Sequence, residues 1–410
     1  MRDPGPAIAA EQAAPIPFRE FVALVAAMMA LTALSIDSML PALPAIGGSL
    51  DVDDANQWQF IITAFMLGFG GAQIVLGPLS DRFGRRRVLA VGLVVAVIAN
   101  AGCALAPSFP LLLAARFLSG TGVAAARVVT IAVVRDCFSG RAMARVMSLA
   151  FMVFMIVPVL APTFGQLVLL AGPWPWIFVG IGAMALLVLA WFLLRLPETL
   201  PVERRAPIHP SRLLAAWRTV LSDRYSVGYT IAALLLQGGM FGFLGSVQQI
   251  VFDIFDRPRS LPAVFAGIAS AMAAASFFNS RIVMALGTRL ISHAALVAFT
   301  VLAGMHLAVA WSGLENFWTF LVLQALMMGC FGLCGANFSS MAMERMGDIA
   351  GTAASLQGFA AVVGGAVIGA LIGLAYDGTT VPLYAGFLTV GVISLAVVWF
   401  TEHRRLFHRG

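Results

Sequence analysis

Hydrophobic residues along the chain gather into long runs that are separated by short polar segments rich in arginine. Each run is about 20 residues or longer, which is the length that an α-helix needs to cross the hydrocarbon core of a bilayer. The runs lie at residues 20–44, 57–79, 87–106, 110–134, 143–170, 174–195, 226–251, 261–280, 290–312, 316–342, 350–375 and 381–400. The pattern therefore predicts an all-α polytopic membrane protein with twelve transmembrane helices.

The composition supports this interpretation and excludes the soluble classes. Hydrophobic residues make up 60% of the chain and charged residues only 11%, whereas a soluble domain is about 45–50% apolar and about 25% charged. Four scattered cysteines are too few for the disulfide framework of a small secreted protein. Several charged residues, such as Arg2, Asp3 and Glu11, occur among the first 20 positions, and no short apolar core with a cleavage site precedes the first run. We therefore expect this run to be an uncleaved span and not a signal peptide.

The positions of the basic residues predict the orientation. All 25 are arginine, and 21 of them fall at the termini or in alternate loops. Arg257 and Arg259 fall on the opposite side, while Arg116 and Arg127 lie inside spans. By the positive-inside rule, both termini are expected in the cytoplasm. This topology accounts for the net charge of +6 and the pI near 9.8, so no nucleic-acid partner is expected.

One interior connection is much longer than the others. Residues 196–225 contain four prolines and five arginines, and we expect them to form a cytoplasmic linker between an N-terminal six-helix bundle (1–195) and a C-terminal six-helix bundle (226–410). Many secondary transporters build an alternating-access site from two such halves. A weak internal repeat agrees, because Arg82-Phe83-Gly84-Arg85 follows the second span and Gly287-Thr288-Arg289 follows the eighth.

The cytoplasmic end of the second span carries the sequence Gly77-Pro78-Leu79-Ser80-Asp81-Arg82-Phe83-Gly84-Arg85-Arg86-Arg87. Its glycines allow a tight turn, and its charges can hold or release a neighbouring helix end. An ordinary positive-inside loop is the alternative on charge alone, but the spacing resembles the G-x-L-a-D-r-x-G-r-k motif of the major facilitator superfamily. We interpret the following residues, from this loop and the end of the fourth span, as a gate motif: Gly77, Asp81, Arg82, Gly84, Arg85, Arg86, Arg135 and Asp136.

Three further segments narrow the resemblance to the twelve-span drug:proton antiporters, in particular the Bcr/CflA-type multidrug exporters. Ile36-Asp37-Ser38-Met39-Leu40-Pro41-Ala42-Leu43-Pro44 is similar to that branch's T-D-M-Y-L-P-A-L-P, except at Ser38 and Met39. Arg116-Phe117-Leu118-Ser119-Gly120-Thr121-Gly122-Val123-Ala124-Ala125 resembles R-x-x-Q-G-x-G-A-A, with Ser119 for glutamine. In the fifth span, the segment containing Pro158, Ala161, Pro162 and Gly165 resembles the antiporter motif A-P-x-x-G-G, with Gln166 for the last glycine. The resemblance implies a major facilitator fold and proton-driven export of small amphiphilic compounds.

Asp37 is the only carboxylate well inside the first six spans, and an ion-coupled exporter needs a group that changes charge as protons arrive. Asp37 and Arg116 each lie six or seven residues from the outer ends of their spans, about 9–10 Å deep at 1.5 Å per residue. We hypothesise a switching pair, in which Arg116 holds Asp37 ionised in one state and protonation or a substrate releases it in the other. A purely structural ion pair is the alternative.

Other polar residues inside the spans are candidates for the substrate cavity. Arg127 shares a helix face with Arg116, about 16 Å away, and it either lines the cavity or snorkels towards the cytoplasmic surface. The candidates in the C-terminal half are Gln237, Phe241, Gln324 and Asn337. For the polar members of this set, hydrogen bonding between helices is the alternative.

Two features of the C-terminal half have more local interpretations. Gly365, Gly369 and Gly373 recur one helical turn apart in the eleventh span, and they predict a close helix contact, where we expect the two halves to slide. His306 has no acid or histidine at i±4, so we assign it no metal or proton-relay role.

Together these features predict a multi-pass drug:proton antiporter of the bacterial inner membrane that works as a monomer. Its expected partners are a small-molecule substrate, protons and the lipid bilayer. No G-x-x-x-x-G-K-[ST] loop occurs, and no enzymatic activity, cofactor or metal is expected. Two alternatives stay open: a transporter that exports or imports a native metabolite such as a sugar or an amino acid, and a non-transporting membrane sensor, which needs neither the Asp–Arg pair nor the gate motif.

Overall fold

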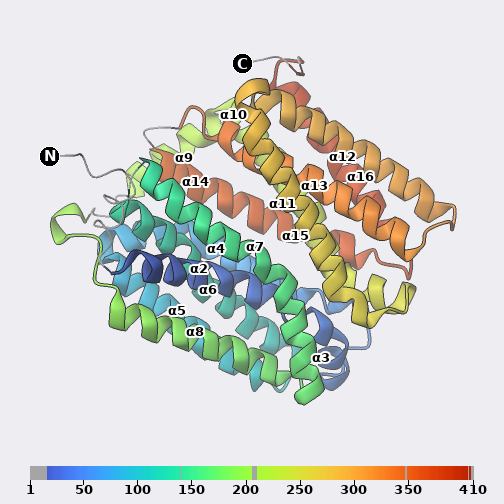
Figure 1. The fold of residues 1–410 in the computed structure, drawn as a ribbon, viewed down its shortest axis with the longest axis horizontal. Helices are drawn as coiled ribbons and strands as arrows, with labels where there is room; N and C mark the ends of the chain where they lie inside the picture. The colour runs from blue at the N-terminus through green and yellow to red at the C-terminus, as the bar shows by residue number, and fades with distance from the viewer. Residues whose placement is uncertain (1–15, 139, 206–209, 347–348, 405, 408–410) are drawn as a thin grey trace. The chain divides into compact units, whose positions relative to one another are not determined.

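A computed structural model describes residues 16–138, 140–205, 210–346, 349–404 and 406–407, without the placement of some side chains within helices, chiefly at residues 141–159. The described residues form helices joined by short turns, and no strand occurs among them (Figure 1). The predicted all-α class is confirmed.

The first half of the chain contains six long helical segments. Its elements are α2 (Phe18–Asp37), η1 (Leu40–Ala42), α3 (Leu43–Ser49), η2 (Ala55–Gln57), α4 (Phe60–Phe83), α5 (Arg85–Ala104), α6 (Phe109–Cys137), α7 (Gly140–Ala171) and α8 (Pro175–Arg195). The second half continues with η3 (Val202–Arg204), α9 (Pro210–Ser222), α10 (Arg224–Gln249), η4 (Ile250–Ile254), η5 (Pro258–Ser260), α11 (Leu261–Leu286), α12 (Thr288–Trp311), α13 (Phe317–Ala342), α14 (Ala350–Phe359), η7 (Ala360–Gly364), α15 (Gly365–Leu374) and α16 (Val381–Thr401).

Eleven helical segments of the described chain are long and apolar enough to cross a membrane. The remaining predicted span corresponds to α7, which is 32 residues long and has no charged residue from Val146 to Ala171. Most predicted boundaries lie within a few residues of the observed ones. The eighth span is an exception, because α11 continues past its apolar run to Leu286, and Gly287 (φ 82°) ends it.

The first span is broken instead of ending where its apolar run was predicted to end. α2 stops at Asp37, and the chain then continues through η1 and α3 as far as Ser49. Pro41 and Pro44 each occupy the first turn of one of these short helices, where the missing N–H costs no hydrogen bond. The two prolines therefore place Asp37 at a helix end inside the membrane segment.

The predicted linker at 196–225 is not wholly irregular, because Pro210–Ser222 forms α9. Val220 of this helix is buried in an apolar cluster with Met346 and Ala353. The four prolines and five arginines of the linker conceal this helix, which is stabilised by tertiary packing of one face.

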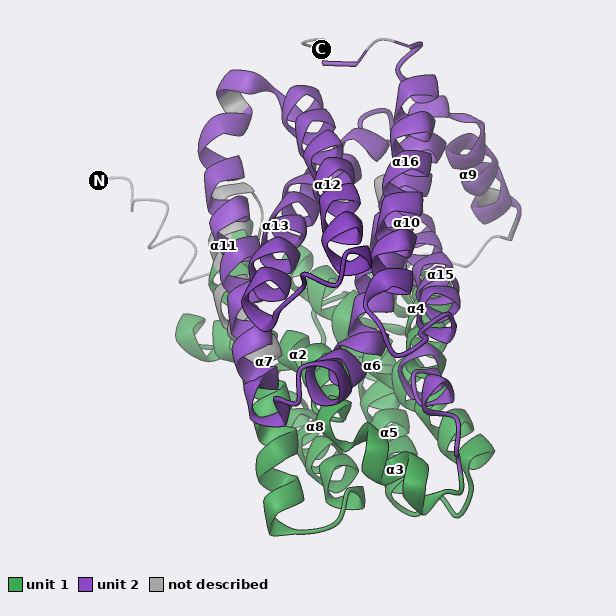
Figure 2. Ribbon diagram, turned by 90° about the vertical axis from the view of Figure 1, so that its right-hand side faces the viewer, with its two compact units in different colours: residues 1–51, 64–209 green, residues 52–63, 210–410 purple. Residues whose placement is uncertain are grey.

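The chain separates into two compact units (Figure 2). Unit 1 comprises residues 1–51 and 64–209, and unit 2 comprises residues 52–63 and 210–410. Residues 52–63 belong to unit 2 although they follow the first span, because Asn56 donates from Nδ2 to the Tyr376 carbonyl oxygen at 2.9 Å. Gln59 also lies directly against Gly373.

Close helix packing builds each unit. In unit 1, α5 packs on α6 and α8, and α2 packs on α7; in unit 2, α10 packs on α15 and α16. A Cβ added at Gly369 of α15 would lie 2.6 Å from the Phe241 Cβ and 2.8 Å from the Gly242 nitrogen of α10. The close contact predicted for the eleventh span is therefore made with α10, and the expectation that the two halves slide there stays a prediction.

We expect Gly369→Ala to destabilise the protein, because the added methyl group must push apart two helices that touch through backbone atoms. Overpacking of this kind costs about 1–3 kcal/mol, and thermal unfolding in detergent, followed by tryptophan fluorescence, should show a melting temperature several degrees lower. The matched control is Gly335→Ala in α13, where nothing lies within 4 Å of the added Cβ. Equal melting temperatures for the two variants would contradict the assigned contact.

Candidate functional site

Asp37 is the last residue of α2, and its surroundings isolate its carboxyl group. The residue is only 6% exposed. Among the residues that the structure describes, none forms a hydrogen bond or an ion pair with its side chain. A buried carboxyl group without a protein partner is costly to keep as an ion, so its position makes Asp37 a candidate functional residue.

Arg116 of α6 lies beside this helix end. It is fully buried, and its Nη2 donates to the carbonyl oxygen of Ser35 at 3.0 Å. Its guanidinium carbon also lies 4.6 Å from the ring centroid of Phe65 and 5.6 Å from that of Phe178. The last carbonyl groups of a helix lack intrahelical partners, and Arg116 therefore caps α2 two residues before Asp37.

The structure brings Asp37 and Arg116 to the same helix end but does not join them. No Asp37–Arg116 ion pair within 4.0 Å is present in this conformation, although both residues are described. The physical reason is that α2 offers Arg116 its unpaired terminal carbonyl groups, and a cation stabilises a helix C-terminus. The hypothesis of a switching pair thus requires a second conformation.

The antiporter motif of α7 contacts the residue that follows Asp37. Gly165 is packed so tightly that an added Cβ would lie 1.9 Å from the carbonyl oxygen of Ser38. Ala161 and Pro162 are buried on the same helix, while the side chain of Pro158 lies outside the described part of the structure. Segments of α2, α6 and α7 that were singled out separately in the sequence therefore meet around Asp37.

The gate motif forms an ion-pair network centred on Arg85, whose side chain is 4% exposed. Its Nε donates to Asp136 Oδ2 at 2.9 Å, and its Nη1 contacts Asp81 Oδ1 at 2.6 Å and donates to Ser80 Oγ at 2.6 Å. Gly84 adopts φ 95°, a left-handed conformation that glycine accommodates readily, and so turns the chain from α4 into α5. One buried arginine thus ties together the ends of α4, α5 and α6.

The other predicted gate residues lie around this network. Arg82 is exposed, with its guanidinium carbon 5.2 Å from the Phe83 ring centroid, and Arg135 is exposed. Arg86 donates from Nη2 to the Leu193 carbonyl oxygen at 2.6 Å. Gly77 supplies a carbonyl oxygen that accepts from Ser80 Oγ at 2.9 Å.

Glu198 belongs to this network but was missed from the sequence. Its carboxylate accepts hydrogen bonds from the backbone nitrogens of Arg85 at 2.9 Å and Arg86 at 3.2 Å, which are unpaired donors at the start of α5. The sequence offered only a Pro-Glu-Thr triplet directly after the sixth span, so the partner became visible only in three dimensions.

Unit 2 contains a counterpart of this network, which the weak internal repeat foreshadowed. Gly287 adopts φ 82° before α12, and Arg289 contacts Glu402 Oε1 at 3.0 Å and Glu344 Oε2 at 2.8 Å. Glu402 is 2% exposed and also accepts from the Tyr229 hydroxyl at 2.5 Å. Arg289 thus corresponds to Arg85, and Glu402, directly after the last span, corresponds to Glu198.

The predicted cavity residues differ in their surroundings. Asn337 donates to Asn279 Oδ1 of α11 at 3.0 Å, which favours the role of interhelical hydrogen bonding for this residue. Phe241 packs under Gly369. Gln324 is fully buried, and neither polar atom of its side chain has a hydrogen-bond partner among the described residues.

Two other predicted cavity residues are less enclosed. Arg127 is half-buried, and Gln237 is half-buried with only a 3.8 Å contact to the Met240 sulfur. Arg127 has no ion-pair partner in the described part of the chain, so the two roles proposed for it stay open.

His306 has a partner that the i±4 rule could not find. Its Nε2 lies 2.7 Å from Glu315 Oε1, in the turn after α12, and Thr380 donates to the other oxygen of the same carboxylate. Tyr384 stacks on the imidazole with ring centroids 3.5 Å apart. Through Thr380 and Tyr384, the His306–Glu315 pair links α12 to the start of α16. Across the described residues, no group of three His, Cys, Asp or Glu side chains is placed to hold a metal ion.

Comparison with known proteins matches residues 25–370 to the Major Facilitator Superfamily. The chain is 30% identical to the uncharacterized MFS-type transporter YdgK of Bacillus subtilis over 90% of this chain and 92% of the relative. It is 29% identical to a bicyclomycin resistance protein homolog of Haemophilus influenzae (95% and 98% covered) and 28% identical to the multidrug resistance protein MdtL of Escherichia fergusonii (92% and 95%). The xylose transporter XylE from E. coli, in a partially occluded inward open conformation, has the same fold, with a TM-score of 0.69 at 13% identity (93% and 97% covered).

We expect Arg85→Gln to destabilise the protein strongly, because it leaves Asp136, 14% exposed, without its buried cation. Breaking a buried pair by removing one partner costs about 3–5 kcal/mol, and less where a carboxylate such as Asp81, 45% exposed, can be rehydrated. Thermal unfolding should show a melting temperature lower by several degrees. The matched control Arg82→Gln removes the same charge from an exposed position three residues earlier. It should change the melting temperature by at most a degree or two. Equal shifts would show that the Arg85 network does not stabilise unit 1.

Proposed function

The chain belongs to the Major Facilitator Superfamily and is a multi-pass membrane transporter of small molecules, and we propose that it exports amphiphilic compounds, antibiotics among them, in exchange for protons. Relatives named for bicyclomycin and multidrug resistance support this substrate class. The proposal places the protein in the bacterial inner membrane as a monomer, with both termini in the cytoplasm. The bundles 1–195 and 226–410, joined by the linker 196–225, alternate in opening the substrate site to the two sides.

The observation that carries the proposal is the isolated carboxyl group of Asp37. It is 6% exposed and has no hydrogen bond or ion pair to any described residue, although three motif-bearing helices converge beside it. An acid that only stabilised the fold would be expected to have such a partner. A group that must gain and lose a proton during transport must instead have no permanent hydrogen-bond or ion-pair partner.

Arg116 and Asp37 have different roles in this mechanism. Arg116 fixes the end of α2 through the Ser35 carbonyl group and supplies a positive charge. In the proposed cycle Asp37 carries the proton while Arg116 is bonded to α2. Release of that proton to the cytoplasm leaves a carboxylate that Arg116 attracts. Contact between the two groups requires α2 to move, and this movement changes the side to which the substrate site is open.

The driving force available to such a cycle is modest but sufficient. Moving one charge through a membrane potential of 100 mV yields about 2.3 kcal/mol, which corresponds to roughly a fiftyfold gradient. Only one titrating group is therefore needed per substrate to maintain a useful concentration ratio of drug. The gate motif residues around Arg85 hold the cytoplasmic ends of α4, α5 and α6 together while α2 moves.

We expect Asp37→Asn to abolish drug-dependent proton movement while leaving the protein folded. Asparagine has nearly the same size but cannot exchange a proton, so an imposed pH gradient can no longer drive export. The measurement is the fluorescence of a trapped pH-sensitive dye in proteoliposomes, with a cationic, a neutral and an anionic antibiotic tested in turn. Asp53→Asn, which removes an exposed carboxylate from the loop before α4, is the matched control and should behave as wild type. Full coupling in Asp37→Asn would disprove the assigned role of Asp37.

Gln324 provides a separate test of the substrate site. If Gln324 has no part in substrate binding, the only effect of Gln324→Leu should be a higher melting temperature, because two buried polar atoms without partners among the described residues are replaced by apolar surface. We propose that Gln324 binds substrate, and so expect the same variant to raise the KM for drug about fivefold or more, since losing a hydrogen bond costs about 1 kcal/mol. Drug-concentration dependence of uptake into inverted vesicles measures this change. A more stable variant with an unchanged KM would remove Gln324 from the site.

A further inference from the structure

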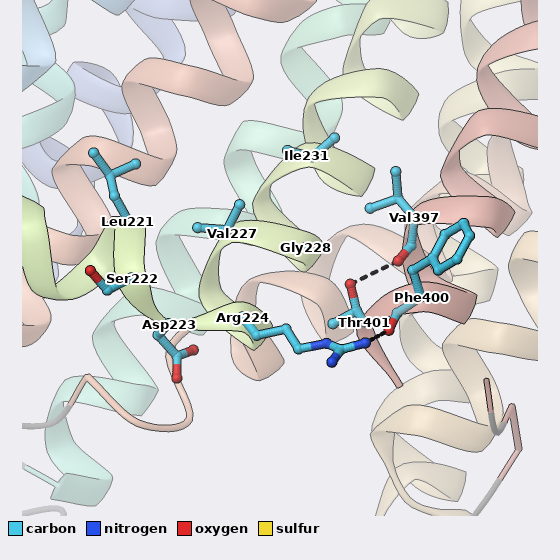
Figure 3. A pocket seen from close by; sticks show the side chains of 10 residues that line it. All are labelled: Leu221, Ser222, Asp223, Arg224, Val227, Gly228, Ile231, Val397, Phe400 and Thr401. Carbon is cyan, nitrogen blue, oxygen red and sulfur yellow. Dashed lines mark hydrogen bonds between the residues drawn. The ribbon is translucent and has the colours of Figure 1, made fainter. Parts of the chain in front are cut away.

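A pocket of about 380 Å³ opens at the end of unit 2 where α10 begins and α16 ends. Its walls are largely apolar, with Val227 and Ile231 from α10, Val397 and Phe400 from α16, and Leu221 from the end of α9. Figure 3 shows Arg224 extending across the mouth of this pocket towards Phe400. The pocket thus combines an apolar interior between two spans with a cation at its rim.

The apolar walls are open to the surroundings of the protein. Leu221 is 65% exposed, Phe400 53% and Ile231 39%. Because α10 and α16 are transmembrane helices, the medium that meets Ile231, about two turns from the start of α10, is the acyl-chain region of the bilayer and not water. A hydrocarbon chain is therefore the ligand that this part of the pocket suits.

The charges at the rim are arranged asymmetrically. Arg218, Arg224 and Arg404 are all exposed. The two acids of the same segments are engaged with other groups, because Asp223 accepts from the Ser226 nitrogen at 2.7 Å and pairs with Arg345, and Glu402 is bound by Arg289 and Tyr229. The exposed rim consequently presents positive charge alone, which is complementary to an anionic ligand.

Arg224 is held in place before any ligand arrives. Its Nη2 donates to the Phe400 carbonyl oxygen at the end of α16, and its Nη1 lies 3.2 Å from His403 Nδ1. A guanidinium group has five N–H donors, so these contacts fix its plane and leave donors for phosphate oxygens. Arginine presents these donors in a fork that matches the geometry of phosphate.

The adjoining helix α9 places this rim at the membrane surface. Ala216 and Val220 face the protein, 8% and 3% exposed, whereas Leu214 and Leu221 are 61% and 65% exposed on the opposite side. An amphipathic helix with exposed leucines and an arginine is typical of segments that lie in the plane of the headgroups. The rim of the pocket is thus at the depth at which a lipid phosphate occurs.

We propose that this pocket binds one anionic phospholipid of the cytoplasmic leaflet, with a phosphate oxygen on Arg224 and an acyl chain between α10 and α16. Basic pockets between transmembrane helices on the cytoplasmic side are suited to anionic headgroups. This site lies wholly in unit 2 and shares no residue with Asp37 or the gate motif, so it stands whether or not the transporter exports drugs. The lipid would join the start of α10 to the end of α16.

The test uses the full chain purified in detergent and a photoactivatable phosphatidylglycerol that carries its crosslinker on the acyl tail. Unlabelled phosphatidylglycerol, phosphatidylcholine with the same chains, and soluble glycerol phosphate serve as competitors. We expect crosslinks to map to Val227–Ile231 and Val397–Phe400, and phosphatidylglycerol to compete at about fivefold lower concentration than phosphatidylcholine. Glycerol phosphate should not compete at the same concentrations, because it lacks the acyl chain.

Two variants separate the headgroup from the acyl contacts. Arg224→Gln should abolish the preference for phosphatidylglycerol, whereas Arg281→Gln, an exposed arginine at the end of α11, should retain it. Val227→Trp fills the pocket and should reduce crosslinking of every lipid at this position, with the melting temperature confirming that each variant is folded. Equal competition by the two lipids in wild type, loss of preference in Arg281→Gln, or a protein dimer that covers these residues would overturn the proposal.

Discussion

A bilayer offers no water to the groups inside it, so each charge that this chain keeps between or at the ends of its spans must be satisfied by the protein. The described structure shows how far this constraint reaches. Arg116 bonds to the Ser35 carbonyl oxygen near the end of α2 and lies against two aromatic rings, while Arg85 and Arg289 each pair with two carboxylates. The Asp37 carboxyl group differs from these three arginines, because no described residue bonds to it.

The same constraint accounts for the correspondence between the two halves. Each half must turn its chain sharply at the membrane surface between two spans, and each uses a glycine with positive φ, Gly84 or Gly287, for that turn. The first arginine after the turn then faces the ends of neighbouring helices. An acid that follows the last span of each half contacts this arginine: Glu198 accepts from the backbone nitrogen of Arg85, and Glu402 pairs with the side chain of Arg289. Two units with no dense sequence repeat thus share one electrostatic arrangement.

The proposed transport cycle and the proposed lipid site depend on different parts of this framework. Transport requires a helix end near Asp37 that is free to rearrange, and the break of the first span by Pro41 and Pro44 supplies it. The lipid site requires a rigid rim, which the bond from Arg224 to the end of α16 supplies. A lipid that joins α10 to α16 would stabilise unit 2 as a single body, against which movements elsewhere can take place.

The sequence by itself determined the fold class and most of the spans, because hydrophobic length and the arginine distribution respond directly to the bilayer. It also singled out Asp37, Arg116 and the gate motif as candidates, since charges and fixed glycines are rare enough inside such runs to be noticed. Features that depend on distant contacts were beyond its reach. The helix α9, the acids Glu198 and Glu402, and the pairing of His306 with Glu315 each arise from packing between segments remote in sequence. Only the tertiary structure decided that Arg116 donates to the Ser35 carbonyl oxygen and not to Asp37, because this contact depends on how α6 packs against the end of α2.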